Sequence, residues 1–81
     1  MPLVDYDPEF LKLLGKMDNS LKEKVKKQIL KIIDNPELGK PRRYMRKDTR
    51  EVYISPFRLS YAYIKNQDKI IFLTIYHKDD Q

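Results

Sequence analysis

Two apolar runs in the last third of the sequence constrain the fold more than any other feature. Residues 51–64 and 70–76 are rich in valine, isoleucine, tyrosine and phenylalanine, and a polar turn at 65–69 separates them. Runs of this composition between turn residues are typical of β-strands. Pro56 interrupts the first run, which indicates an edge, a bulge or a tight turn. The second run barely alternates, so we expect a central strand that is buried on both faces.

The first run does alternate, and the alternation assigns its side chains to two faces. Successive side chains of a strand point to opposite sides of the sheet. One face carries Leu59, Tyr61 and Tyr63, and the other carries Arg58, Ser60 and Ala62. Arg58 is therefore predicted to be a charge held on a stiff strand, on the face away from the core. The single histidine, His77, lies where the second run ends.

The first 35 residues predict a short strand at 3–6 followed by two amphipathic helices. Asp7, followed by a proline and a glutamate, is a helix-start signal. Ser20 and Glu23 have the spacing of a capping box, which we expect at the start of the second helix. Pro36 should end that helix, because the residue before a proline disfavours the helical conformation.

The whole pattern is that of an α+β fold. It consists of an N-terminal strand, an antiparallel helical hairpin and then three or four strands, so the hairpin should pack on one face of a mainly antiparallel sheet. Eighty-one residues are enough for one domain, which we place at 1–81.

Several functional classes are excluded by what the sequence lacks. There is no cysteine, so neither a disulfide framework nor a zinc–thiolate site is expected. No histidine, aspartate and glutamate cluster has metal spacing and no glycine-rich phosphate loop occurs, so we predict no metal and no cofactor. No apolar run approaches the roughly 18 residues of a membrane span, and the N-terminus lacks the pattern of a signal peptide. A cytoplasmic protein with no membrane partner is the expectation.

The positive charge of the chain is concentrated in one stretch. The net charge is +5, and residues 40–58 alone hold seven lysines and arginines against two acidic residues. The planar guanidinium of arginine is well suited to binding phosphate. The candidate binding residues here are Arg42, Arg43, Tyr44, Arg46 and Arg50. We interpret them as a face for nucleic acid or an acidic partner, and the alternative is a solvated basic surface.

Three segments of the sequence occur in a characteristic order. They are Asn-Pro-Glu-Leu-Gly-Lys-Pro at 35–41, the strand at 50–61 with its Phe-Arg-x-x-Tyr sequence, and the apolar strand that ends in His77 and Lys78. Together these segments resemble the RelE/ParE toxin superfamily. The superfamily comprises small toxins of toxin–antitoxin pairs. The resemblance implies either cleavage of messenger RNA, usually in the ribosomal A site, as in RelE-like members, or poisoning of DNA gyrase, as in ParE-like members, which are not nucleases.

The resemblance also suggests roles for particular residues. Arg58 matches the arginine that contacts the scissile phosphate in the RNase branch, and Tyr61 matches an aromatic that is mainly a core residue. His77 and Lys78 fall where that branch has catalytic histidine or basic residues. Two features depart from the RNase pattern: the strand before Arg58 carries an acidic residue and a tyrosine in place of basic residues, and no tyrosine follows His77.

Metal-independent RNA cleavage requires three tasks that these residue types can perform. The ribose 2′-hydroxyl must lose a proton, charge on the phosphate must be stabilised, and the leaving oxygen must gain a proton. Arg58 suits the second task. His77 can act as base or acid near neutral pH, and Glu51 is an alternative base if it shares the face of Arg58. The structural alternatives are a cross-strand salt bridge for Arg58 or Glu51, and a surface or capping role for His77.

The leading hypothesis is a toxin that acts as a metal-independent endoribonuclease on mRNA at the ribosome and thereby inhibits translation. Arg58, His77 and Glu51 are its candidate catalytic residues, and Lys78 joins the candidate substrate-binding residues. Its expected partners are mRNA, the ribosome and a small acidic, RelB-like antitoxin. The alternatives are a ParE-like or catalytically weakened toxin that only binds its target, and a non-toxic RNA-binding module.

Overall fold

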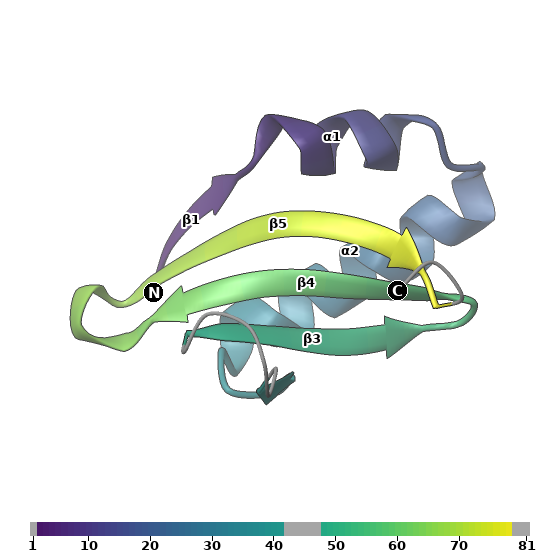
Figure 1. Ribbon diagram of the computed structural model, residues 1–81. Helices are drawn as coiled ribbons and strands as arrows, with labels where there is room; N and C mark the ends of the chain where they lie inside the picture. The colour runs from purple at the N-terminus through teal and green to yellow at the C-terminus, as the bar shows by residue number, and fades with distance from the viewer. Residues whose placement is uncertain (1, 42–47, 79–81) are drawn as a thin grey trace.

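The computed structural model describes residues 2–41 and 48–78. The elements in chain order are β1 (Leu3–Tyr6), α1 (Pro8–Gly15), α2 (Asn19–Asp34), β2 (Lys40–Pro41), β3 (Thr49–Ile54), β4 (Phe57–Ile64), a 3₁₀ turn (Lys65–Gln67) and β5 (Lys69–His77). Figure 1 shows α2 crossing behind the sheet and α1 lying along β5. Among the described residues, no helix combines the length and the apolar character that crossing a membrane requires.

The five strands form one sheet in the order β1-β5-β4-β3-β2. Only β1 runs parallel to its neighbour β5, and the remaining pairs are antiparallel. The predicted α+β fold is confirmed: an N-terminal strand, two helices and then four strands form a mainly antiparallel sheet with the helices packed on it. The strand β2 has only two residues.

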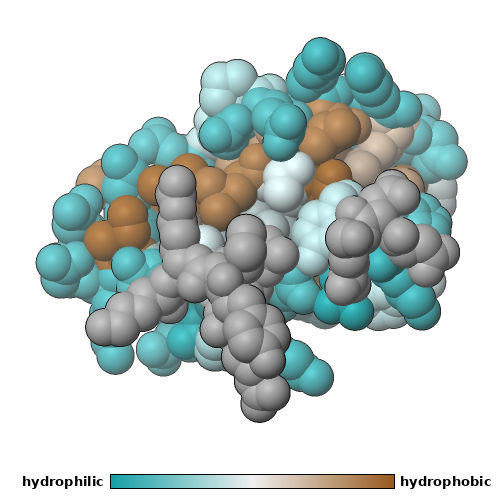
Figure 2. Space-filling model, viewed as in Figure 1, coloured by the Kyte–Doolittle hydropathy of each residue, from teal (hydrophilic) through white to brown (hydrophobic). Residues whose placement is uncertain are grey.

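The strand β5 is not buried on both faces as predicted. It lies between β1 and β4, but only Ile70, Phe72 and Ile75 are buried. The reason is that the helices cover one face of the sheet, and the other face of β5 stays partly exposed. Apolar surface remains visible there, across the region that β5 occupies in Figure 1 (Figure 2). A register shift between β4 and β5 at Ser60 and Tyr61 explains why buried positions 72 and 75 are three residues apart.

The core forms where the two helices meet this sheet face. Its fully buried side chains include Phe10 of α1, Ile32 of α2, Leu59 of β4 and Phe72 of β5. The rings of Phe10 and Phe72 are 5.6 Å apart, and Tyr61 lies 6.1 Å from Phe72 on the other side. Burying a phenylalanine or leucine side chain contributes roughly 1.5–3 kcal/mol, so this cluster supplies much of the stability of a small domain.

The helix ends follow the predicted signals with one exception. The Asp7 side chain accepts a hydrogen bond from the amide of Glu9, as expected, and α2 ends just before Asn35. The capping box predicted at Ser20 is wrong. The Asp18 carboxylate instead accepts the amide of Leu21 at 2.8 Å, so α2 begins earlier, at Asn19. An aspartate is a strong N-cap, and its place two residues upstream explains the difference.

The interruption at Pro56 is a tight turn, in agreement with the sequence. Residues Ser55 and Pro56, joined by a cis peptide bond, connect the paired residues Ile54 and Phe57 at the end of the β3–β4 hairpin. The amide of Lys78 donates to the carbonyl of Pro56. This hydrogen bond holds the segment after β5 against the β3–β4 turn.

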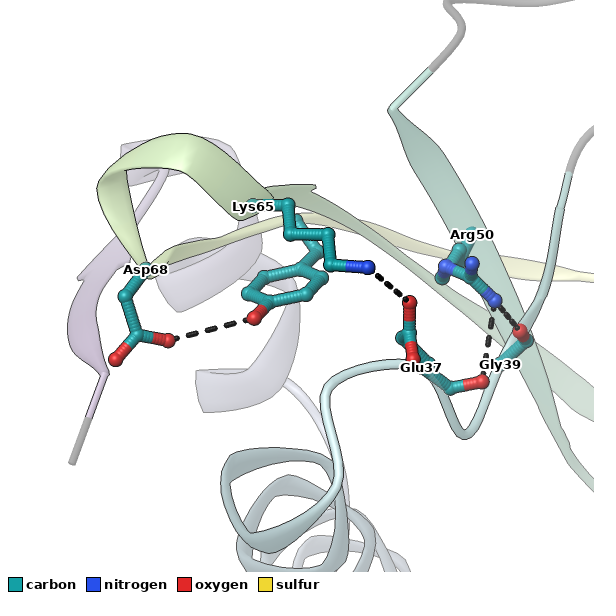
Figure 3. Close-up of polar contacts among 6 residues, drawn as sticks. Glu37, Gly39, Arg50, Lys65 and Asp68 are labelled. Atoms are coloured by element: carbon teal, nitrogen blue, oxygen red, sulfur yellow. Dashed lines mark hydrogen bonds and ion pairs between the residues drawn. The ribbon is translucent and has the colours of Figure 1, made fainter.

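A clamp of two side chains, Tyr61 and Arg50, holds the loop that enters β2. The Tyr61 hydroxyl donates to the Pro36 carbonyl and accepts the Gly39 amide, both at 2.8 Å. The Arg50 guanidinium donates to the carbonyls of Gly39 at 2.8 Å and Glu37 at 3.1 Å (Figure 3). Buried backbone groups need such partners, so the clamp fixes where β2 meets β3.

Replacing Gly39 with alanine should destabilise the protein by about 1–3 kcal/mol, because the site is already filled. A Cβ atom at this position would lie 2.8 Å from the Tyr61 ring and hydroxyl and 3.0 Å from the Glu51 carbonyl. Gly15→Ala is the matched control, since its Cβ would meet nothing within 4 Å. We expect that variant to be neutral or stabilised by up to about 1 kcal/mol. Urea unfolding of both variants measures the difference, and equal stabilities would contradict the proposed close packing.

The stability of the protein should fall above pH 10 in a way that depends on Tyr61. Burial raises the pKa of Tyr61 above its ordinary value of 10.0, against the opposing effects of the Gly39 amide and the Arg50 charge. Above pH 10 the unfolded chain loses this proton while the folded protein retains it, so the free energy of unfolding decreases.

Tyr61→Phe is the comparison that isolates this effect. At neutral pH the variant should be less stable by about 1–3 kcal/mol, because two buried backbone groups lose their partner. Above pH 10 its deficit relative to the wild type should shrink. The pKa of Tyr63 is also raised by burial, but that residue is present in both proteins. A deficit that stays constant between pH 8 and pH 11 would show that the Tyr61 proton does not contribute.

Candidate functional site

The strand register determines which polar side chains share a face with Arg58. Across the three long strands, Arg58 pairs with Tyr53 on β3 and with Tyr76 on β5. Glu51 lies two residues from Tyr53 and therefore points to the same side of the sheet. We call this side, which faces away from the α2 residues of the core, the open face. The predicted position of Arg58 outside the core is confirmed.

Three of these side chains are joined through one carboxylate. Glu51 Oε1 accepts a hydrogen bond from Arg58 Nη1 at 2.7 Å, and the two side chains form an ion pair through this contact. Glu51 Oε2 accepts a hydrogen bond from the Tyr76 hydroxyl at 2.6 Å. The Glu51 side chain is 17% exposed and that of Arg58 is 35% exposed, so the contacts are partly shielded from water. We refer to Arg58, Glu51 and Tyr76 as the triad.

Arg58 remains incompletely satisfied within the triad. The hydrogen bond that Arg58 donates to Glu51 raises the pKa of Arg58, with partial burial acting in the opposite direction, so the guanidinium stays charged. Its Nε atom is buried and has no hydrogen-bond partner among the described residues. Leaving a buried donor unpaired costs free energy. An acceptor that reached the Nε atom would remove this cost. A phosphate group is a well-matched acceptor for a guanidinium, because two of its oxygens can each accept one of two parallel hydrogen bonds.

Lys78 and Tyr53 extend the site beyond the triad. The Lys78 ammonium lies 5.9 Å from the centre of the Tyr53 ring, and the Tyr53 side chain is 53% exposed. The structure therefore brings Lys78, a predicted substrate-binding residue, to the same end of the open face as Arg58. At this distance the ammonium is attracted to the face of the ring.

The structure does not bring His77 to the triad. His77 pairs with Phe57, one position out of step with Arg58 and Tyr76, so its side chain leaves the sheet on the helix side. There its ring contacts the Phe57 ring edge-on, with 5.4 Å between centroids. The neighbour that does reach Glu51 is Tyr76, which was absent from the predicted catalytic set. Strand alternation implies that only one of Tyr76 and His77 shares the face of Arg58, but the register that decides between them is set by the pairing of β4 with β5.

Of the other predicted binding residues, the structure describes only Arg50. It lies in the clamp, where its guanidinium donates to backbone carbonyls. Arg42, Arg43, Tyr44 and Arg46 lie outside the described residues. No group of three metal-binding side chains occurs in the described ranges 2–41 and 48–78.

Comparison with known proteins identifies the family. Residues 4–81 match the family model of the ParE toxin of type II toxin–antitoxin systems. The chain belongs to this family. It is a toxin of the RelE/ParE superfamily, as its sequence motifs suggested. None of the curated proteins matches the sequence.

Solved structures of RelE toxins share the fold of this toxin. The intact RelBE toxin–antitoxin complex of E. coli matches with a TM-score of 0.83 and 19% identity, over 95% of this chain and 96% of that chain. The RelBE2 complex of Mycobacterium tuberculosis matches with a TM-score of 0.81 and 20% identity, over 96% and 100%. The RelE–RelB complex of Pyrococcus horikoshii gives a TM-score of 0.77 and 11% identity, over 99% and 98%. The predicted RelE-like fold is thereby confirmed.

Proposed function

We propose that this toxin is a metal-independent endoribonuclease that cleaves mRNA at the ribosome, in the cytoplasm, and so inhibits translation. The triad is the observation that carries the proposal. It places a guanidinium, a carboxylate and a phenol in direct contact on the open face, and these groups can serve as the anion stabiliser, the base and the acid of RNA cleavage without metal. The position of Lys78 supplies a further cation beside them.

The first step of the proposed reaction is an exchange of anions at Arg58. In the protein without RNA, the Glu51 carboxylate forms an ion pair with the Arg58 guanidinium and accepts a hydrogen bond from the Tyr76 hydroxyl. The scissile phosphate would take the place of Glu51 on Arg58, where it can accept two parallel hydrogen bonds from the guanidinium. Glu51 Oε1 then lies beside the bound phosphate, where a base is needed.

The remaining steps transfer two protons and leave the enzyme unchanged. Glu51 accepts the proton of the ribose 2′-hydroxyl, and the 2′-oxygen attacks the phosphorus while Arg58 stabilises the charge on the phosphate oxygens. Tyr76 donates its proton to the departing 5′-oxygen. The products are a 2′,3′-cyclic phosphate and a 5′-hydroxyl. Glu51 then returns the proton to Tyr76 along the 2.6 Å contact that already joins them.

A toxin that only binds its target, such as gyrase in the ParE manner, is the second candidate. The same ion pair favours it, because Glu51 neutralises Arg58 in the free protein and reduces its attraction for phosphate. The match to the ParE family model also supports it. The two candidates differ in whether changes to the triad abolish a chemical reaction.

We further propose that a small acidic, RelB-like antitoxin is the partner of this toxin. The support is the likeness to RelE chains solved in complex with RelB, together with the net charge of +5, which favours a partner of opposite sign. An acidic chain that folds on binding could cover a large part of so small a domain.

Arg58→Ala should reduce cleavage of a translated message by about 10²–10³, since one preorganised donor for the transition-state charge is lost. Arg58→Lys should recover little of this loss, because a point charge cannot replace the planar fork. The measurement is primer extension on mRNA in a translation mixture, with circular dichroism to confirm that each variant is folded. Full cleavage by folded Arg58→Ala would exclude the triad as the catalytic site.

His77→Ala serves as the control for the assignment of Tyr76 as the acid. We expect His77→Ala to keep cleavage near the wild-type level, because the His77 ring packs against Phe57 on the helix side. Tyr76→Phe should lose most cleavage, because it removes only the hydroxyl. The opposite result, loss with His77→Ala and retention with Tyr76→Phe, would transfer the acid role to the histidine.

Glu51→Gln should separate binding from cleavage. The amide cannot hold Arg58 as an ion pair, so a 2′-O-methyl RNA, which cannot be cleaved, should bind about two- to fivefold more tightly. Cleavage of normal RNA should fall by about 10²–10⁴, because the general base is lost.

Glu37→Gln is the matched control for that experiment. It changes the net charge equally, but Glu37 pairs with Lys65 at 3.6 Å, outside the triad. We expect near wild-type binding and cleavage. If Glu51→Gln behaves like Glu37→Gln in both assays, Glu51 is neither a competitor of the phosphate nor the base.

A further inference from the structure

A groove lies beside β3, on the side where β2 pairs with it. Its volume is about 420 Å³, and it is lined by residues of α2, of the clamped loop, of β2, of β3 and of β4. It lies where β2 meets β3: Lys40 and Pro41 pair with Glu51 and Arg50, and Lys40 and Glu51 contribute to the lining. Figure 1 shows α2 passing behind the sheet and emerging beside β3.

The groove is continuous with the triad. Glu51 and Arg58 belong to its lining as well as to the ion pair on the open face. A molecule that fills the groove therefore lies next to any phosphate held by Arg58. Single-stranded RNA can satisfy both sites at once, because the nucleotide adjacent to the scissile phosphate is covalently linked to it.

The chemistry of the lining matches a nucleotide. Lys31 of α2 and Lys40 of β2 add two positive charges beside Arg58, against the single negative charge of Glu51. The residue Tyr53 is 53% exposed, and its ring supplies a flat aromatic surface on which a base can stack. Leu38, 43% exposed, gives an apolar surface on the loop.

The remaining polar residue in the groove is suited to reading a base edge. Gln28 of α2 lines the groove and is only partly exposed. Its amide offers both donors and an acceptor, which is the combination needed to distinguish the edges of unpaired bases. The volume of the groove lies near the lower end of the range for ligand sites, which suits one nucleotide.

We propose that this groove binds the nucleotide adjacent to the scissile phosphate, and that it gives the toxin a base preference. The base stacks on Tyr53, its edge contacts Gln28, and its outer phosphate lies between Lys31 and Lys40. This inference rests on the proposed action on RNA, but it concerns binding and can be tested without cleavage.

The test is binding of labelled 2′-O-methyl hexanucleotides to the full-length protein, measured by fluorescence anisotropy for four homopolymers. Tyr53→Ala should weaken binding by about tenfold, as expected for one lost stacking contact, whereas Tyr53→Phe should bind nearly as the wild type does. Gln28→Ala should reduce the differences in affinity among the four oligonucleotides. Equal affinities of the alanine and phenylalanine variants would overturn the stacking assignment.

Two lysines of α2 provide a charge-matched pair. Lys31→Ala should lower the slope of log affinity against log salt by about one, because one phosphate contact is lost. Lys26→Ala removes the same charge from the same helix, but residue 26 lies about 200° around the helix from Gln28, so its slope should not change. Equal slopes for the two variants would show that the groove holds no phosphate.

The outcomes separate this inference from the proposed function. If the wild type cleaves RNA but no groove variant changes oligonucleotide affinity or base preference, the groove inference fails and the nuclease stands. If the groove variants behave as expected while Arg58→Ala changes no reaction, the groove inference stands and the nuclease fails. Preferential binding of an acidic peptide, with competition against the oligonucleotides and no base preference, would assign the groove to a protein partner.

Discussion

The pleat of β4 is the constraint on which the rest of the structure depends. Each residue of this strand must serve either the core or the open face, because successive side chains point to opposite sides. Leu59 and Tyr61 enter the core, and Arg58 and Ser60 lie on the other side. The packing that buries Leu59 against the helices therefore also holds Arg58 in place. A catalytic or binding arginine on such a strand needs little reorganisation when a ligand arrives, which is the condition for effective electrostatic stabilisation.

Tyr61 connects that core to the edge of the sheet. Its ring packs near Phe72, and its hydroxyl holds the loop at Pro36 and Gly39. The loop leads directly into β2, and Leu38 of the loop and Lys40 of β2 line the groove beside β3. The same tyrosine that belongs to the core thus also holds the loop that borders the groove. Arg50 acts with it from β3, so a residue of a basic segment has become part of the framework.

The carboxylate of Glu51 gives the open face two opposing properties. It orients Arg58 and Tyr76 with short contacts, and it also occupies the guanidinium that a phosphate would need. A salt bridge of this kind is worth little near water, so a ligand that binds the guanidinium with two oxygens can replace it. Whether the toxin is a nuclease or only a binder therefore depends on how readily this exchange occurs. The partial exposure of Arg58, 35%, leaves the guanidinium accessible for it.

Local patterns in the sequence determined the helix start at Asp7, the turn at Pro56, the α+β fold and the face of Arg58, because each depends on neighbours along the chain. Only the tertiary structure decided which residues meet Arg58. The pairing of β4 with β5 places Tyr76, and not His77, beside it, and a shift of one residue would reverse this choice. The clamp role of Arg50 and the contribution of α2 to the groove were likewise beyond the sequence pattern. Strand register and helix placement are set by packing between distant segments, and alternation along one strand carries no information about them.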